Sequence, residues 1–229
     1  MEYLILFLPL LASIISGFFG KLIGDKMSQI ITSLFVSVSA LLSLVVFYKV
    51  ITSGYENNLI IATWINSGSL NVNWSINIDA LSSVMLVVVT VISSLVHIYS
   101  IGYMSHDAHK ARFMSYLSLF TFAMLTLVTS DNFIQLFFGW EGVGLCSYFL
   151  IGFWFKKPSA NAAAIKAFLV NRVGDFGFAL GIFLIFYIFG TVNYNEVFQK
   201  IPEIINRELV FIGININAVD LICLLLFVG

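Results

Sequence analysis

Six apolar stretches, each long enough to cross a bilayer as a helix, constrain the fold of this chain more than any other feature. A spanning helix needs about 20 residues, because each residue advances it by about 1.5 Å through about 30 Å of hydrocarbon. We therefore predict an all-α polytopic membrane protein, with the start of a seventh span near residue 218. The six complete spans are predicted over residues 3–24, 29–52, 79–103, 112–129, 132–155 and 161–189.

Composition supports a membrane protein and excludes several other classes. Hydrophobic residues make up 60% of the 229 residues and charged residues only 10%, whereas soluble domains have about 45–50% and about 25%. The net charge of -1 gives no reason to expect a nucleic-acid partner. Cys146 and Cys223 lie in apolar runs and are interpreted as core residues, not as a disulfide or metal pair. We find no metal-ligand spacing and no hydrolytic triad.

Both ends of the chain are interpreted as helical. The N-terminus lacks the positive region of a secretory signal, since its first charge is Glu2 and its first lysine is Lys21, so we expect a retained helix. The last apolar run, Ala218 to Gly229, has about half the residues of a span. We therefore expect the chain to stop inside its seventh helix, as the N-terminal fragment of a larger helical bundle.

The loops predict an orientation. Three loops that must share one side of the membrane carry most of the basic residues, and the positive-inside rule places them in the cytoplasm or matrix. The N-terminus is then on the outer side, together with the alternate loops 53–78 and 190–217 and the short turn at Ser130 and Asp131. The basic residues of these loops are Lys21, Lys26, Lys110, Arg112, Lys156 and Lys157.

The outer loop 53–78 carries a strand signal. Apolar residues alternate with polar ones from Leu70 to Ile78, a period of two that is typical of a half-exposed strand. The turn residues Asn66, Ser67 and Gly68 separate this stretch from the apolar run 59–65. We predict a small β-hairpin near 59–78 on the outer surface.

Glu141 lies near the middle of the fifth span. A charge at the bilayer centre costs from about 2.5 to more than 10 kcal/mol, and such residues usually face a bundle interior and serve a function. The glycines at 139, 142 and 144 should let a neighbouring helix approach closely. We expect Glu141 to exchange protons. The alternative is a structural glutamate that stays protonated and hydrogen-bonds a neighbour.

The sixth span contains Lys166, Arg172 and Asp175. Arg172 and Asp175 are three residues apart, so they can pair along one helix face. Because the fifth and sixth spans run in opposite directions, both should lie at the depth of Glu141. They are interpreted as members of a proton path, or alternatively as a pair that only fixes packing. Lys166 is either a relay lysine or a side chain that reaches back to the interface.

His97 lies in the third span, nearer its basic end. It is either a proton relay at the inner entrance or a core histidine with satisfied hydrogen bonds. His106 and His109 belong to a charged loop and are interpreted as surface residues. The acidic residues that precede or begin spans from the outer side are interfacial or helix-capping, namely Asp79, Asp131 and Asp220.

The segments around these charges resemble a known family. LFFGWEGVGLCSYFLIGFWF and KAFLVNRVGDFGFALGIF, together with VHIYSIGYM and INIDALSSVMLVVVT, closely resemble the antiporter-like subunit L (chain 5) of respiratory NADH:quinone oxidoreductase, complex I. The resemblance extends along the whole chain. It implies a longer bundle with two inverted repeats and broken helices at the membrane midplane. The chain would then contain residues 1–111 as preceding helices and 112–229 as the first part of the first repeat.

The resemblance also implies roles for individual residues. Glu141 matches the family glutamate of the fifth helix, which faces a lysine on a broken seventh helix that would fall beyond Gly229. Arg172 and Asp175 match the base and acid of the sixth helix. His97 matches the histidine of the third helix.

The implied function is proton translocation coupled to quinone reduction in other subunits. NADH, flavin, iron–sulfur clusters and quinone would be bound by those subunits, and no cofactor or metal by this chain. Its partners would be other membrane-arm subunits, the lipid bilayer and protons, in a bacterial or mitochondrial inner membrane. Two alternatives stay open: a subunit of a multisubunit Na⁺/H⁺ antiporter, and a non-transporting scaffold whose buried charges only hold helices together.

Overall fold

Long helices make up most of the computed structural model, which describes residues 1–211 and 213–229. Six helices within the described residues are long and apolar enough to cross a membrane, which confirms the six predicted spans. Two shorter helices follow them, α7 (Tyr194–Ile204) and α8 (Ala218–Val228). The six long helices are α1 (Glu2–Ile23), α2 (Asp25–Ser53), α3 (Ala80–Tyr103), α4 (Lys110–Val128), α5 (Phe133–Ile151) and α6 (Pro158–Phe189).

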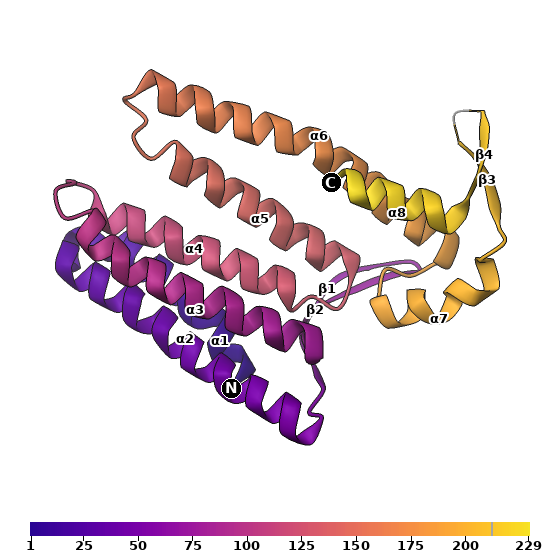
Figure 1. Ribbon diagram of the computed structural model, residues 1–229, viewed down its shortest axis with the longest axis horizontal. Helices are drawn as coiled ribbons and strands as arrows, with labels where there is room; N and C mark the ends of the chain where they lie inside the picture. Colours follow the sequence, from indigo (N-terminus) through magenta and orange to yellow (C-terminus); the bar gives the residue numbers. More distant parts are fainter. Residues whose placement is uncertain (212) are drawn as a thin grey trace.

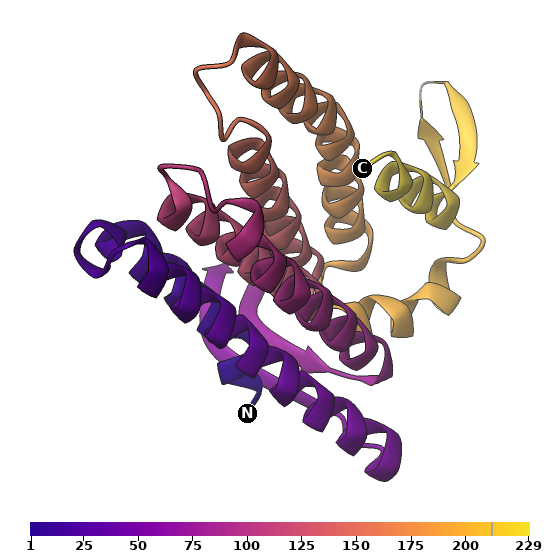
Figure 2. The same ribbon diagram turned by 60° about the vertical axis from the view of Figure 1, so that its left-hand side comes forward.

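The long helices lie side by side along the long axis of the molecule (Figure 1). Helix α4 packs against α1, α2 and α3, and also against α5, which in turn packs against α6. Figure 2 shows α5, α6 and α8 extending from the group formed by α1 to α4. The sequence analysis divides the chain between residues 111 and 112. Helix α4 packs against helices on both sides of that point, so the packing does not mark a boundary there and the division stays a prediction.

Small hydroxyl side chains join the first four helices. Ser43 of α2 lies 2.7 Å from Thr90 of α3, measured between hydroxyl oxygens, and Ser13 of α1 lies 3.2 Å from Ser115 of α4. A Cβ added at Gly17 would lie 2.7 Å from the Ser115 hydroxyl, so glycine is needed for this approach of α1 to α4. Small and hydroxylated residues are typical of closely packed membrane helices.

The predicted hairpin is confirmed and is slightly longer than expected. Strands β1 (Asn57–Ser67) and β2 (Leu70–Ile78) pair antiparallel around a turn in which Gly68 has a φ of 58°. The alternation of β2 arises because one face is buried, with Val72, Ile76 and Ile78 all 1% exposed. Gln135 of α5 holds this strand by accepting from the Ser75 N–H (2.9 Å) and donating to the Ser75 carbonyl (2.7 Å). The hairpin is therefore an integral part of this end of the bundle.

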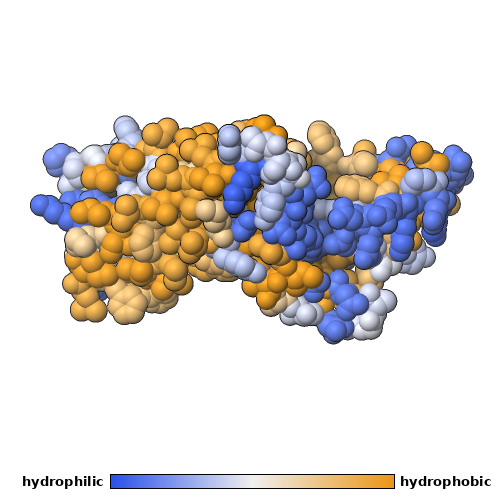
Figure 3. All heavy atoms as spheres, turned by 90° about the horizontal axis from the view of Figure 1, so that it is seen from below, coloured by the Kyte–Doolittle hydropathy of each residue, from blue (hydrophilic) through white to orange (hydrophobic). Residues whose placement is uncertain are grey.

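The segment 190–217, interpreted from sequence as a loop, contains ordered elements. It includes α7 and the strands β3 (Glu208–Phe211) and β4 (Ile214–Asn217), which pair antiparallel. Asn193 caps α7, Val197 is buried, and Lys200 donates to the carbonyl of Phe189 at the end of α6 (2.9 Å). These elements gather at the same end of the molecule as the first hairpin (Figure 1). Polar side chains collect at that end, whereas apolar ones cover most of the remaining face (Figure 3).

Several predicted boundaries change for local reasons. Helix α5 ends at Ile151 instead of 155, because residues 152–157 form turns before Pro158 starts α6. Asp79 caps α3 through the N–H of Ser82, as one of the two interpretations held. Asp131 and Asp220 do not cap helices. Instead, Asn132 caps α5 and Asn217, three residues before Asp220, caps α8.

Candidate functional site

Glycines bring α5 against α4 next to Glu141. A Cβ added at Gly139 would lie 2.7 Å from the Leu127 Cα, and one at Gly142 would lie 3.0 Å from the Ala123 Cβ. Nothing lies within 4 Å of a Cβ added at Gly144. The predicted close approach is therefore correct at 139 and 142 and wrong at 144. The contact of Gly139 and Gly142 with α4 sets the rotation of α5, and Glu141 then faces α6.

Arg172 of α6 joins two carboxylates. Its Nη1 bonds the Oε1 of Glu141 on α5 and lies 3.6 Å from the Oδ2 of Asp175 on its own helix. Its guanidinium carbon also lies 4.7 Å from the centroid of the Phe168 ring. The structure thus brings together three of the predicted site residues. With all three ionised, this cluster of Glu141, Arg172 and Asp175 carries one more negative than positive charge.

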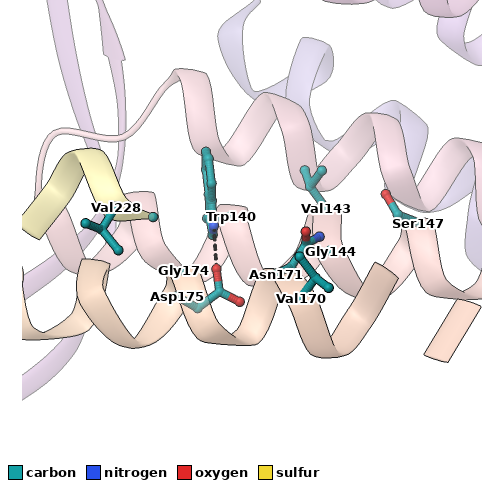
Figure 4. A pocket seen from close by; sticks show the side chains of 10 residues that line it. Trp140, Val143, Gly144, Ser147, Val170, Asn171, Gly174, Asp175 and Val228 are labelled. Carbon is teal, nitrogen blue, oxygen red and sulfur yellow. Dashed lines mark hydrogen bonds between the residues drawn. The ribbon is translucent and has the colours of Figure 1, made fainter. Parts of the chain in front are cut away.

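Asp175 has a second partner that sequence reasoning missed. The indole N–H of Trp140 donates to its Oδ1 at 2.7 Å, across the interface of α5 and α6 (Figure 4). The side chain of Asp175 is 7% exposed, whereas that of Glu141 is 25% exposed. The available signal was the position of Trp140 beside Glu141, because an indole N–H in a membrane needs an acceptor. Asp175 is therefore the more buried and more firmly held of the two acids.

A cavity of about 380 Å³ opens beside this cluster. Trp140 and Ser147 of α5 and Asn171 and Asp175 of α6 contribute polar groups to its lining (Figure 4). The end of α8 closes one side, because Val228 lies against α6 where a Cβ at Gly177 would meet its Cγ1 at 2.7 Å. A polar cavity of this size has room for several water molecules. Asp175 therefore adjoins a space in which water could carry a proton.

Two predicted site residues lie outside the cluster. Lys166 is exposed on α6 and makes no ion pair with any described residue. His97 is fully buried between α3 and α4, where Nδ1 lies 2.7 Å from the Ser93 carbonyl and Nε2 lies 3.0 Å from the Ser118 hydroxyl. Both ring nitrogens of His97 are thus engaged. A relay role for either residue stays a prediction.

The described residues contain no group of three or more His, Cys, Asp or Glu side chains that could hold a metal ion. Both cysteines are free thiols. Cys146 is buried as predicted, whereas Cys223 is exposed, so its interpretation as a core residue is wrong. The cluster itself offers two carboxylates, one guanidinium and an indole. Such a set can exchange protons and rearrange ion pairs.

Six helices long enough to span a membrane, two of which carry an ion-pair cluster between them, define a polytopic membrane protein with charges within its spans. Residues 64–114 match the family model for the N-terminus of NADH-ubiquinone oxidoreductase (complex I) chain 5, and residues 130–229 match that for the transmembrane region of NADH:quinone oxidoreductase and Mrp antiporters. The chain belongs to the family of NADH:quinone oxidoreductase chain 5, also called subunit L.

Curated relatives share about half of the sequence. The chain is 52% identical to NADH-ubiquinone oxidoreductase chain 5 from Chondrus crispus. The matched region covers the whole of this chain and 34% of the relative. It is 50% identical to NADH-quinone oxidoreductase subunit L from Rickettsia bellii (strain RML369-C), and this match covers 99% of the chain and 35% of the relative. It therefore spans about a third of the length of these relatives.

A solved structure of the Mrp complex from Dietzia sp. DQ12-45-1b has a similar fold. The TM-score is 0.72 with 23% sequence identity, over 86% of this chain and 20% of that chain. At this identity the likeness concerns the fold alone.

Proposed function

We propose that this chain is part of a proton-translocating membrane subunit of NADH:quinone oxidoreductase, which couples quinone reduction elsewhere in the complex to proton pumping. The observation that carries the proposal is the position of Arg172 on α6 between Asp175 and Glu141, which lies near the middle of α5, beside a partly polar cavity. Charges are costly at this depth, and where they occur they mark ion and proton pathways.

The cluster can act as an electrostatic switch. One guanidinium cannot fully neutralise two carboxylates, so one acid is always the better proton acceptor. When Arg172 pairs with Glu141, Asp175 is left to its indole partner and the cavity. When it pairs with Asp175, Glu141 is released. A charge that approaches from a neighbouring helix or subunit would shift this balance and drive proton uptake or release.

We propose Lys166 and His97 as further relay groups of the path. Lys166 lies on the same helix as Arg172 and nearer the basic loops, which supports a role on the inner side. The hydrogen bond between His97 and Ser118, which connects α3 with α4, supports a relay role for His97. The lysine partner expected for Glu141 would follow Gly229 in the longer relatives.

The whole protein would work within a larger assembly. We propose that its partners are other membrane-arm subunits, lipids and protons, and that NADH, flavin, iron–sulfur clusters and quinone are bound by other subunits. Relatives that are subunits of NADH-ubiquinone and NADH-quinone oxidoreductase support this assembly. The proposed location is a bacterial or mitochondrial inner membrane with the N-terminus on the outer side, supported by the basic loops that end α1, α3 and α5.

A cation/proton antiporter of the multisubunit Na⁺/H⁺ type is the second candidate. It is favoured by the match of residues 130–229 to a model shared with Mrp antiporters and by the fold of the Mrp complex. Inverted membrane vesicles with the full-length protein distinguish the two. We expect proton uptake that requires NADH. Proton movement driven by a Na⁺ gradient without NADH would instead support the antiporter.

Glu141→Gln in the full-length protein tests the proposed function. NADH oxidation and proton uptake are measured in the same vesicles, after assembly of the complex has been checked on a native gel. We expect assembly to be retained and proton uptake to fall relative to NADH oxidation. A variant that fails only in assembly would support the scaffold alternative.

A further inference from the structure

A second pocket, of about 210 Å³, lies among the ends of α4, α5 and α6 at the basic side of the bundle. Arg112, in the first turn of α4, contributes a half-buried guanidinium to its lining. This group lies 4.7 Å from the centroid of the Phe153 ring and 5.3 Å from that of Phe155, and its Nη2 donates to the Phe153 carbonyl at 3.3 Å. Its Nε is buried without a hydrogen-bond partner among the described residues. Arg112 is thus held in place with donor capacity unused.

No carboxylate in the part of the chain that the structure describes forms an ion pair with Arg112. The nearby acid is Asp107, which accepts instead from the indole of Trp154 (2.9 Å) and from the N–H of His109 (2.7 Å). Burial raises the pKa of Asp107, but these hydrogen bonds and the charges of His109 and Arg112 outweigh it, so the pKa lies below its usual value. Asp107 is already engaged and leaves Arg112 available for an external anion.

Two helices begin at this pocket. Neither α4 nor α6 has an acidic residue in its first turn or a side-chain cap, and among the described residues Asp107, which accepts from the N–H of His109 just before α4, is the one acid bonded there. Each helix N-terminus carries about half a positive charge. The side chains of Lys110, Lys156 and Lys157 stand at the same ends. Four basic side chains outnumber Asp107 here, and the two helix N-termini add more positive charge than the C-terminus of α5 removes, so the potential around the pocket is positive.

We propose that this pocket binds the phosphate group of an anionic phospholipid in the leaflet on the basic side of the protein. The planar guanidinium donates well to phosphate oxygens. A lipid is favoured over a soluble anion because the pocket has aromatic walls, including Tyr116 and Tyr148, and because the exposed rings of Trp154 and Phe155 lie where the spans end. Basic pockets between membrane helices bind lipid head groups in this way. The site is separate from the cluster around Glu141.

Site-specific photocrosslinking tests the proposal. The full-length protein carries Phe155→p-benzoylphenylalanine and is studied in the assembled complex, in nanodiscs of phosphatidylcholine with a minor fraction of phosphatidylglycerol. After irradiation, mass spectrometry identifies the lipid attached at 155. We expect phosphatidylglycerol adducts to exceed its share of the lipid, and Arg112→Gln to lower them about fivefold. Lys26→Gln, an exposed basic residue on the same side, should leave them unchanged.

The remaining outcomes decide the source of the phosphate. Excess inorganic phosphate should not reduce the phosphatidylglycerol adduct; a reduction would show a soluble-anion site and overturn the lipid assignment. Adducts in proportion to the lipid mixture, or equal yields with Arg112→Gln, would overturn the site itself. If Arg112→Gln does not assemble, Arg112→Lys retains the charge but loses the planar donors, and an intermediate yield is expected. Whether or not Arg112→Gln assembles, the yields of phosphatidylglycerol and phosphatidylcholine adducts in the protein that retains Arg112 decide whether the pocket selects the anionic lipid.

Discussion

Trp140 of α5 donates its indole N–H to Asp175 of α6 at 2.7 Å, one residue away from Glu141. The other carboxylate oxygen of Asp175 lies 3.6 Å from Arg172, so both sides of this buried acid are held. Trp140 acts by positioning, because it fixes the orientation of Asp175 without being able to exchange a proton itself. The more exposed Glu141 is the acid with greater freedom to change its partner.

Trp140→Phe should destabilise the full-length protein. The ring is retained, but Asp175 loses a hydrogen bond in a buried position, at a cost of about 1–3 kcal/mol. The midpoint of thermal unfolding in detergent measures the effect. Trp154→Phe is the matched control, because it also removes an indole donor to an aspartate, Asp107, but in a loop at the surface. Equal losses in the two variants would contradict the positioning role.

Arg172→Gln and Arg172→Lys should differ in activity. Glutamine removes the cation that two carboxylates share, so proton uptake per NADH oxidised should fall strongly. Lysine retains the charge, but its side chain is shorter than that of arginine, whose Nη1 contacts both acids, so an intermediate loss is expected. Both variants are compared in vesicles at equal amounts of assembled complex. If glutamine pumps as well as arginine, the switch described above is wrong.

Gly139→Ala should separate α5 from α4. The new Cβ would lie 2.7 Å from backbone atoms of Leu127, which cannot move aside as a flexible side chain could. Overpacking of this kind costs about 1–3 kcal/mol. Gly144→Ala is the control on the same helix, since nothing lies within 4 Å of its Cβ. We expect a lower unfolding temperature for the first variant only, and equal behaviour would refute the packing assigned to Gly139.

Gln135→Leu should loosen the first hairpin. It leaves the N–H and carbonyl of Ser75 without their buried partner, at about 1–3 kcal/mol for each group. Hydrogen exchange of β2 reports the change directly and should accelerate. Gln29→Leu removes a buried amide whose Nε2 has no hydrogen-bond partner among the described residues, so it should be neutral or stabilising. Unchanged exchange in Gln135→Leu would show that the hairpin is held by other contacts.

The spans could be predicted because a bilayer permits few spanning structures, and apolar length therefore determines the helices. The contact between Glu141 and Arg172 also agrees with expectation, since the opposite directions of α5 and α6 fix their depth. The depth of a residue in the membrane does not determine the direction in which its side chain points around the helix axis. For this reason the sequence did not show that Gly144 faces open space or that Trp140 reaches Asp175.

The segment 190–217 was missed because its elements are short. Helix α7 has 11 residues and strands β3 and β4 have four each, too few for a periodic pattern to stand out. A capping asparagine at 193 and apolar residues at helical spacing, Val197, Ile201 and Ile204, were the available signals. The alternatives for His97 differ only in its hydrogen bonds, which no single-sequence pattern contains.

The proton-to-electron ratio of Glu141→Gln tests the central claim most directly. Proton uptake and NADH oxidation are recorded together in inverted vesicles that contain the assembled complex. Glu196→Gln, which removes an exposed carboxyl on α7, is the control. The proposed function predicts normal assembly and a clearly lowered ratio for Glu141→Gln, with an unchanged ratio for the control. An unchanged ratio in fully assembled Glu141→Gln would contradict it.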